Sequence, residues 1–355
     1  MASVVAMRVL VAMSGGVDSS MAAALLCEQG HDVTGVHLKM ADTPSGLPGK
    51  GCCTLDDARD ARRVADRLGM PFYVWDLSEA FRERVVDDFV AEYAAGRTPN
   101  PCIRCNERVK YTALLARARA LGFDALATGH HVRLRTDADG HHLHRATDPG
   151  KDQTYVLYMA TQEQLAHTIW PAGEHTKADL RAYAAERGLV TASKPDSHDI
   201  CFIPSGDLGA FLRPRLGARE GVLVGPDGSE VGRHDGAYRF TVGQRRGLHL
   251  GGFAEPMYVT AIEGETVHVG PRAALEAEAL LADRLSWVAG APPPADRALG
   301  AQVRYRGEAL PCRLDDLGSG RIAVAFTAER PLGVAPGQAV VLYDGDECLG
   351  GATIR

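Results

Sequence analysis

Three cysteines are the residues of this sequence whose types and spacing could do chemistry most directly. Cys102 and Cys105 form a Cys-x-x-Cys pair beside two prolines that flank Asn100, and Cys201 follows far downstream. The three-residue spacing places Cys102 and Cys105 on one face of a turn that enters a helix. Thiols near a helix N-terminus and beside arginines have a lowered pKa and therefore more thiolate. The pattern predicts reactive rather than buried thiols.

A glycine turn near the N-terminus, Ser14-Gly-Gly-Val-Asp-Ser19, is the second stretch with chemical character. It follows an apolar run that predicts a strand over 9–13 and precedes a pattern that predicts a helix ending at Gln29. The first N–H groups of a helix are unpaired and lie at the positive end of its dipole, so we expect this turn to hold phosphate. The alternative is a capped turn without a ligand.

The composition of the turn narrows the kind of phosphate site. It lacks the Lys of the ATP-cleaving P-loop and the three spaced glycines of the dinucleotide loop. It resembles the pyrophosphate loop of ATP pyrophosphatases, which split ATP between the α- and β-phosphates. On that resemblance the residues that cradle the leaving pyrophosphate are Ser14, Gly15, Gly16, Asp18 and Ser19. Asp18 is also an expected partner for Mg²⁺.

Strands and helices alternate over the first half of the chain. Strands are expected over 32–38, 71–77 and 124–128, helices over 54–69, 78–95 and 161–188, and a hairpin over 132–145. This order predicts an α/β fold with a doubly wound, Rossmann-like parallel sheet. Ligands of such sheets bind beyond the carboxyl ends of the strands, where Met40 and Gly129 emerge. Met40 could pack on an adenine ring or in the core, and Gly129 could let backbone approach the nucleotide.

The composition of the sequence changes near residue 203, where Gly and Pro become frequent and short runs of alternating apolar and polar residues begin. Runs over 221–224, 238–242, 257–262 and 266–269 predict a small β-rich domain. Later runs over 301–305, 310–314, 321–327, 339–343 and 348–354 predict a closed β-barrel. We therefore expect a catalytic domain over 1–203, a central β-rich domain over 204–275 and a barrel domain over 276–355.

Composition bounds the class of protein. The chain has 355 residues, 45% of them hydrophobic and 24% charged, and a formal net charge of -6. No run approaches the roughly 20 apolar residues of a spanning helix, so we expect no membrane contact and a cytoplasmic location. Eight cysteines in a chain this long do not indicate a secreted disulfide framework. Residues 97–119 carry six basic side chains and one acid, which indicates either a phosphate-backbone footprint or a solvated helix.

The ordered set of motifs resembles the bacterial tRNA-specific 2-thiouridylases over nearly the whole chain. Besides the glycine turn, the set comprises Thr98-Pro-Asn-Pro101, Cys105-Asn106, Thr128-Gly-His130, Gly150-Lys-Asp-Gln-Thr-Tyr155, Ser193-Lys-Pro195, Asp199-Ile-Cys-Phe-Ile203, Phe240-Thr-Val-Gly-Gln-Arg-Arg-Gly247, Val303-Arg-Tyr305 and Ala335-Pro-Gly-Gln338. The resemblance implies an adenine-nucleotide alpha hydrolase fold in the catalytic domain. It also implies an enzyme that adenylates O2 of the wobble uridine of tRNA with ATP and replaces it with sulfur.

The family's residue roles carry over by position. Cys105 matches the nucleophile and Cys201 the cysteine that carries sulfur as a persulfide, two thiols able to form a disulfide on turnover. The positions that match the ATP site are Ala12, Met13, Ser14, Gly15, Gly16, Val17, Asp18, Ser19, Met40 and Gly129. The positions that match the contact with the target base are Asn100, Pro101 and Cys102. The positions that match tRNA contacts are His130, Lys151, Asp152, Gln153, Arg304, Tyr305 and Gln338.

Cys102 departs from the family, because better-known members have Asp at this position. Two mechanisms fit the three thiols. In the first, Cys201 takes sulfur from a donor such as a cysteine desulfurase or persulfide carrier, and Cys105 assists its release. In the second, Cys102, Cys105 and Cys201 hold a 4Fe–4S cluster with one open iron. Structural zinc with His198 as the fourth ligand is a third option.

Two other kinds of protein share part of this pattern. One is a different ATP pyrophosphatase, such as an amidating ligase or a tRNA lysidine synthetase, which adenylates a carbonyl oxygen but has no need of three thiols. The other is an RNA-binding module that senses adenine nucleotide without reaction, which leaves the stretch around Cys201 without a purpose. Cys52 and Cys53 lie in a loop rich in Gly and Pro and receive no role.

Overall fold

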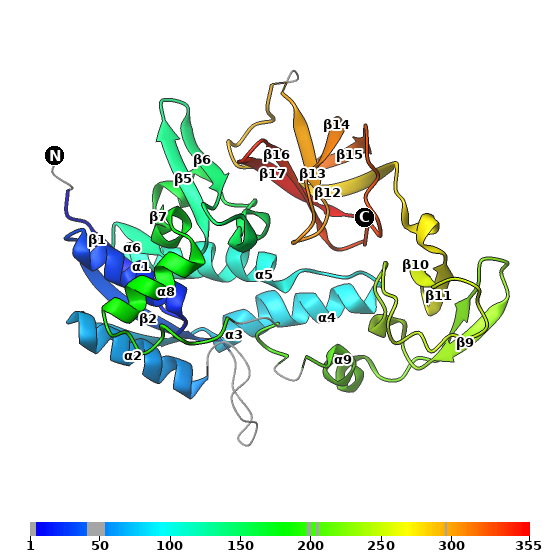
Figure 1. The fold of residues 1–355 in the computed structure, drawn as a ribbon, viewed down its shortest axis with the longest axis horizontal. Helices are drawn as coiled ribbons and strands as arrows, with labels where there is room; N and C mark the ends of the chain where they lie inside the picture. Colours follow the sequence, from blue (N-terminus) through cyan, green and yellow to red (C-terminus); the bar gives the residue numbers. More distant parts are fainter. Residues whose placement is uncertain (1–4, 41–53, 197–199, 204–205, 295–296) are drawn as a thin grey trace.

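The computed structural model describes residues 5–40, 54–196, 200–203, 206–294 and 297–355 (Figure 1). Cys52, Cys53 and His198 lie outside the described residues. At the N-terminal end of the chain a parallel sheet forms, with the strand order β3-β2-β1-β4-β7. Its strands are β1 (Arg8–Ala12), β2 (Asp32–Lys39), β3 (Phe72–Asp76), β4 (Ala125–Ala127) and β7 (Thr168–Ile169).

Helices cover both faces of this sheet because alternate strand residues are apolar on both sides. Val9 and Val11 of β1 pack on helices α1 (Val17–Glu28), α2 (Leu55–Leu68) and α8 (Lys177–Glu186). Leu10 faces the opposite way, toward Tyr111 and Leu114 of the helix behind the sheet. That helix consists of α5 (Pro101–Arg104), a π-helical stretch (Cys105–Leu114) and α6 (Leu115–Ala120). The predicted doubly wound sheet is confirmed.

The remaining helices of the first domain follow the predicted positions in part. Thr54 caps α2 through a reciprocal bond with Asp57, and Gly69 ends that helix in a left-handed conformation, as the sequence predicts. The expected helix over 78–95 contains α3 (Ser78–Phe81), a π-helical turn (Arg82–Val86) and α4 (Asp87–Ala94). The expected helix over 161–188 was wrong in its middle. There α7 (Gln162–Ala166) is followed by β7 and a turn at Pro171 before α8 begins.

The central region holds a small mixed sheet with the order β10-β11-β8-β9. Its strands are β8 (Gly221–Val224), β9 (Glu230–His234), β10 (Tyr258–Glu263) and β11 (Thr266–Gly270), and α9 (Leu208–Leu216) precedes them. The strand expected over 238–242 was wrong, because Ala237–Arg239 forms a 3₁₀ turn. Tyr238 is buried there against Phe89 of α4, so this residue packs on α4 instead of pairing in a sheet.

The C-terminal region is a closed barrel. Its six strands are β12 (Ala279–Trp287), β13 (Leu299–Gln302), β14 (Leu310–Gly318), β15 (Arg321–Phe326), β16 (Ala339–Asp344) and β17 (Glu347–Ile354). Closure occurs because β12 pairs with both β15 and β17. The predicted barrel is confirmed, although β12 is absent from the predicted strands.

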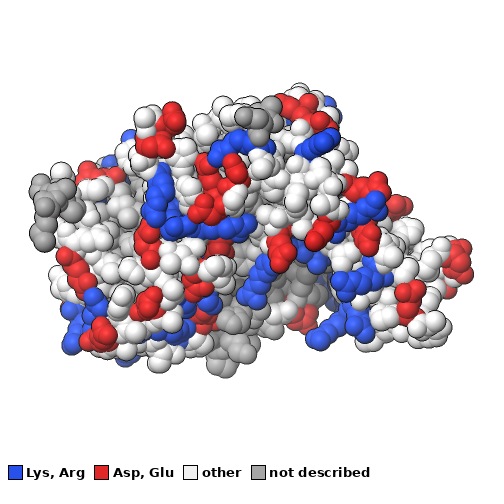
Figure 2. All heavy atoms as spheres, turned by 45° about the horizontal axis from the view of Figure 1, so that its top comes forward, with Lys and Arg blue, Asp and Glu red and all other residues white. Residues whose placement is uncertain are grey.

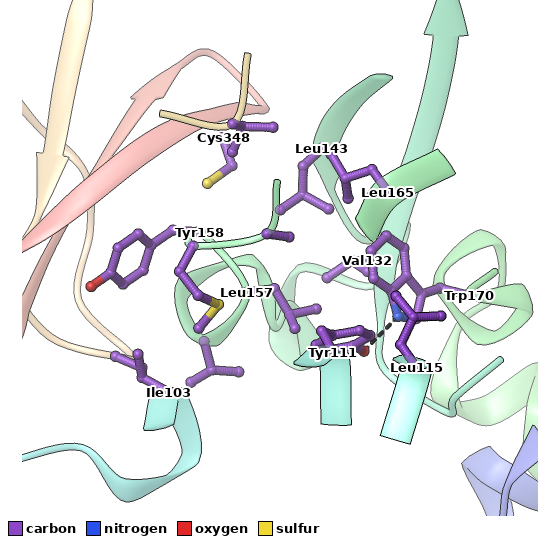
Figure 3. Packing of buried hydrophobic residues seen from close by; sticks show 14 of the residues in the cluster. Ile103, Tyr111, Leu115, Val132, Leu143, Leu157, Tyr158, Leu165, Trp170 and Cys348 are labelled. Carbon is purple, nitrogen blue, oxygen red and sulfur yellow. Dashed lines mark hydrogen bonds between the residues drawn. The ribbon is translucent and has the colours of Figure 1, made fainter. Parts of the chain in front are cut away.

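A hairpin of the first domain extends the barrel sheet. Strands β5 (Val132–Asp137) and β6 (Gly140–Arg145) lie beside β17, where Leu143 is in register with Cys348. Figure 3 shows the core at this junction, in which Leu143 and Cys348 belong to the same buried cluster as Tyr111 and Trp170. The Trp170 indole N–H donates to the Tyr111 hydroxyl at 2.9 Å. The first and last parts of the chain therefore share one hydrophobic core.

None of the helices in the described part of the chain combines the length and apolarity that crossing a bilayer requires.

Candidate active site

The glycine turn lies between the carboxyl end of β1 and the first turn of α1. Ser14 N–H and Ser14 Oγ contact the Ser19 hydroxyl at 3.1 and 3.2 Å, which closes the turn upon itself. Gly16 is the N-cap residue and supplies no side chain to the first helical N–H groups. Those groups remain at the positive end of the helix dipole, where an anion is stabilised.

Two glycines let other segments approach this turn. Gly15 has φ +78°, and a Cβ there would collide with the carbonyl of Asp57 in α2. A Cβ on Gly129 would lie 2.5 Å from the backbone nitrogen of Ser19. Side chains at these positions would push α2 and the segment after β4 away from the turn. The glycine turn is thus bordered by four of the predicted nucleotide-site residues, Ala12, Met13, Val17 and Gly129.

Asp18 projects from α1 into a set of polar groups. Lys177 Nζ lies 2.7 Å from each of its carboxylate oxygens, and His131 Nε2 lies 3.0 Å from Oδ1. Burial raises the pKa of Asp18, but hydrogen bonds and charges from His131 and Lys177 outweigh it, so the pKa lies below its ordinary value. The carboxylate is therefore ionised at neutral pH, as a Mg²⁺ partner must be.

The segment before Cys201 is held by ion pairs to the same region. Lys194 Nζ lies 2.7 Å from Asp57 Oδ1 and 2.8 Å from Asp60 Oδ2, both on α2. Asp196 accepts from Lys151 at 2.8 Å and lies 2.9 Å from Lys177 Nζ. Residues 194–196, upstream of Cys201, are thus anchored next to the glycine turn.

Cys105 lies inside the protein. Its side chain is only 7% exposed, so the expectation of a thiol that is not buried was wrong for this residue. It shares a small apolar cluster with Phe81, Val85 and Val109, and Cys201 packs against the same cluster. The thiol donates to Met40 Sδ at 3.9 Å, which places the end of β2 beside Cys105. The structure thus brings Cys105, Cys201 and Met40 together.

Cys102 lies in a different environment although it is three residues from Cys105. It is exposed, and its N–H is capped by Asn100 Oδ1 at 3.1 Å, while Pro101 is buried. The change from α-helix to π-helix falls at Cys105, and long π-helical stretches are rare and concentrate at functional sites. Among the described residues no group of His, Cys, Asp and Glu is arranged to hold a metal ion. We derive no step through an iron–sulfur cluster.

Four basic side chains of the stretch over 97–119 form ion pairs with acids, some near and some distant in sequence. Arg108 pairs with Asp88 at 2.9 Å, and Arg119 pairs with Glu163 at 2.7 Å. Arg97 pairs with Glu92, and Arg104 with Asp88 and Glu107. Figure 2 shows acidic and basic side chains interleaved over one face of the molecule. Four of the six basic residues thus form ion pairs, and the phosphate-backbone footprint stays a prediction.

Several predicted tRNA-contact residues lie where the barrel meets the first domain. Tyr305 is 37% exposed, and its pKa is raised by burial and by the neighbouring Cys102. Gln153, which also bonds to Tyr305, accepts the His131 N–H at 2.9 Å. Gln338 Nε2 donates to the Thr98 carbonyl at 2.8 Å. These contacts put Cys102, Gln153 and Tyr305 at one site.

Three other predicted contact residues bond to neighbouring residues of the protein. His130 Nδ1 lies 2.7 Å from Thr128 Oγ1, and burial together with the charge of Lys110 holds its pKa well below the ordinary value. Asp152 accepts from Arg145 at 2.9 Å, and its side chain is 7% exposed. Arg304 donates to the Gly333 carbonyl at 2.8 Å.

Four polar residues at the site escaped the sequence analysis: His131, Lys177, Asp57 and Asp60. Lys177 has no motif around it, and only its contact with Asp18 reveals it. Lys194 and Asp196 lie in a stretch whose resemblance to the family was visible, but no role followed from sequence alone.

The fold and site define a class of protein: an α/β protein with a glycine turn after its first strand, a C-terminal barrel, and two thiols, Cys105 and Cys201, packed on one apolar cluster. Family models match residues 7–205 as a tRNA methyl transferase HUP domain, 209–271 as a tRNA methyl transferase PRC-barrel domain, and 277–354 as an aminomethyltransferase beta-barrel domain. The chain belongs to the tRNA-specific 2-thiouridylase family, as its relatives show.

The relatives match along almost their full lengths. The tRNA-specific 2-thiouridylase MnmA of Thermobifida fusca is 53% identical over 352 residues, covering 98% of this chain and 95% of the relative. That of Streptomyces avermitilis is 54% identical over 358 residues, covering 98% and 94%. Among solved structures, a 4-thiouridine synthetase in complex with RNA and bound ATP is 15% identical with a TM-score of 0.36, covering 59% of this chain and 50% of that chain. That last likeness is too partial to bear on function.

Proposed function

We propose that this protein uses ATP to convert the wobble uridine of tRNA to 2-thiouridine, with release of AMP and pyrophosphate. The observation that carries the proposal is the grouping of two thiols, Cys105 and Cys201, on one apolar cluster in a chain that is 53% identical to a 2-thiouridylase. Neither an amidating ligase nor a nucleotide sensor has a use for that thiol pair.

In the first half-reaction O2 of the uridine attacks the α-phosphorus of ATP, and pyrophosphate leaves toward the turn at Ser14–Ser19. Helix N–H groups stabilise the charge on that leaving group. Mg²⁺ would be held at Asp18 and the phosphates, where it supplies neutralisation of charge. The Asp18 carboxylate also accepts hydrogen bonds from Lys177 and contacts His131.

In the second half-reaction the terminal sulfur of a persulfide on Cys201 attacks C2 of the base, and AMP leaves. The Cys105 thiolate then attacks Cys201 Sγ, which forms a Cys105–Cys201 disulfide and releases the base as its C2 thione. An external thiol reductant restores both thiols. A cysteine desulfurase or persulfide carrier supplies the sulfur. Cys105 and Cys201 pack against the same apolar side chains, and this supports the thiol relay over an iron–sulfur site that would need Cys102 as a ligand.

The target base is expected to contact the loop that carries Asn100, Pro101 and Cys102. A base must leave its stack for O2 to be reached, and anticodon loops offer such bases. The barrel residues Arg304, Tyr305 and Gln338, together with His130 and 151–153, are proposed to contact tRNA around this loop. We propose the domain boundaries after residues 203 and 275, which separate the three sheets except for the β5–β6 hairpin.

The test is to incubate the purified chain with tRNA, ATP, Mg²⁺, a persulfide donor and a reductant, and to measure AMP, pyrophosphate and 2-thiouridine. Asp18→Ala should abolish AMP formation. Cys201→Ala should form AMP but no 2-thiouridine. Thiolation at the parental rate in Cys201→Ala would contradict the assigned sulfur carrier.

A further inference from the structure

The ammonium group of Lys177 joins two carboxylates from different parts of the chain. Its Nζ lies 2.7 Å from both oxygens of Asp18 and 2.9 Å from Asp196 Oδ1. A Lys has three N–H donors, so these contacts use all of them. The residue is 8% exposed, although it begins helix α8. Few positions retain a nearly buried Lys without a specific set of partners.

Each carboxylate is also held from another side. His131 contacts Asp18, while Lys151 and Arg181 contact Asp196 at 2.8 Å each. Burial raises the pKa of Asp196, but bonds from Lys151 and Lys177 outweigh it and hold the pKa far below the ordinary value. Both carboxylates are therefore charged at neutral pH. Without the ammonium between them they would repel each other.

The two carboxylates belong to the two halves of the reaction. Asp18 lies in the phosphate turn, and Asp196 lies five residues before Cys201. Lys194, two residues before Asp196, is held by α2 at Asp57, whose backbone carbonyl lies against Gly15 of the same turn. Residues 194–196, upstream of Cys201, are therefore held to the phosphate turn at two points, and Lys177 is the contact that touches Asp18 itself.

We propose that Lys177 is a positioning residue that couples adenylation to sulfur transfer by holding residues 194–196, upstream of Cys201, against the phosphate turn. The proposal rests on the proposed function. Loss of the ammonium leaves Asp18 and Asp196 as facing like charges, so the segment moves away from the turn. The adenylate still forms, but the sulfur on Cys201 reaches it more slowly, and the adenylate is lost to water as AMP.

The experiment measures AMP released per 2-thiouridine formed by the full-length chain with tRNA, ATP, Mg²⁺, a low-molecular-weight persulfide donor and a reductant. Lys177→Met should raise this ratio about ten-fold, the scale of one charged hydrogen bond. Lys177→Arg should lower it again toward the parental value. Asp196→Asn, which keeps the Lys177–Asp18 contact, should also raise the ratio.

Arg187→Gln is the matched control. Arg187 lies at the end of α8 and pairs with Glu28 of α1, so it joins the same two helices; among the described residues its side chain bonds to Glu28 and the Tyr183 carbonyl and not to residues 194–196. Its AMP to 2-thiouridine ratio should stay at the parental value, even if its melting temperature falls.

The outcomes separate the inference from the proposed function. No AMP and no 2-thiouridine from the parental chain would contradict the proposed function. With an active parental chain, an unchanged ratio of AMP to 2-thiouridine in Asp196→Asn would overturn the inference, whether the two products stay at the parental level or fall equally. If Lys177→Met does not fold, as judged by its thermal transition, the Asp196→Asn ratio decides.

Discussion

The side-chain amide of Gln338 donates to the backbone carbonyl of Thr98 at 2.8 Å, and the Thr98 N–H donates to the carbonyl of Pro336 at 2.7 Å. A barrel loop thus holds the loop that carries Asn100 and Cys102. Gly337 between them leaves no room for a side chain, since a Cβ there would lie 2.9 Å from the Thr98 nitrogen. The barrel therefore shapes the loop to which the proposed function assigns the target base.

Gln338→Ala should weaken thiolation through tRNA and not through ATP. One net hydrogen bond is lost, so kcat/KM for tRNA should fall about three- to ten-fold, while the KM for ATP stays unchanged. Steady-state thiolation with each substrate varied in turn measures both values. Gln162→Ala is the control, because its amide makes an equally short bond, 2.8 Å, to the Val288 carbonyl away from this loop. Parental tRNA kinetics in Gln338→Ala would contradict the assignment.

Gly15→Ala should damage both the fold and the nucleotide site. The φ of +78° disfavours a side chain, and the added Cβ would collide with the Asp57 carbonyl. Strain of this kind costs about 1–3 kcal/mol before the collision is counted. Urea unfolding and calorimetric titration with ATP measure the two losses.

Gly69→Ala separates strain from collision in that experiment. Gly69 has φ +69°, but a Cβ there meets no atom within 4 Å. It should lose about 1 kcal/mol of unfolding free energy and bind ATP like the parental chain. An equal loss of stability in both variants would show that the close approach of Asp57 is unimportant.

His142 should make the junction between hairpin and barrel sensitive to pH. Its Nδ1 lies 2.8 Å from Glu347 Oε1 and its Nε2 lies 3.1 Å from Asp137 Oδ1. The bond to Glu347 raises the pKa of His142 above 6.5 despite partial burial. Because the folded-state pKa is the higher one, the stabilisation is complete below pH 6.5 and is lost as the pH rises through the folded-state value.

The measurement compares melting temperatures of the parental chain and His142→Gln on both sides of that range. The parental chain should melt at a higher temperature than His142→Gln at about pH 6, and this difference should shrink by about pH 8.5. The corresponding difference in unfolding free energy should stay below about 1 kcal/mol because the pair lies near the surface. His141→Gln is the control, since His141 contacts the Thr136 hydroxyl and no carboxylate there. A difference that grows with pH would refute the sign.

Protein isolated without oxygen should thiolate tRNA from a persulfide donor without bound iron. The reason is the separation of environments, in which Cys105 is buried with Cys201 nearby while Cys102 is exposed beside Tyr305. Iron, labile sulfide and zinc assays with an ultraviolet–visible spectrum measure the metal content, and treatment with a chelator should leave the rate unchanged. Iron with matching sulfide that disappears in Cys102→Ala would instead establish a cluster with Cys102 as a ligand.

Much of the fold could be predicted from the sequence because its signals are local. The apolar run and double glycine predict β1, the turn and α1, and Thr54 with Asp57 predicts the start of α2. Alternating runs predict β14, β15, β16 and β17 of the barrel. The two-residue strand β7 could not be found in this way, since it exists only through its pairing with β4.

The sequence by itself determined the glycine turn, the strands and helices of the parallel sheet and most strands of the barrel, because their signals lie in neighbouring residues. The phosphate site at the turn and the roles of the thiols stay predictions. Only the tertiary structure decided that Cys105 is buried and that the β5–β6 hairpin joins β17. It alone decided that Asp18 meets Lys177 across 159 residues of chain. Ion pairs of that separation leave no periodicity or spacing to detect, because they form when packed elements bring distant side chains together.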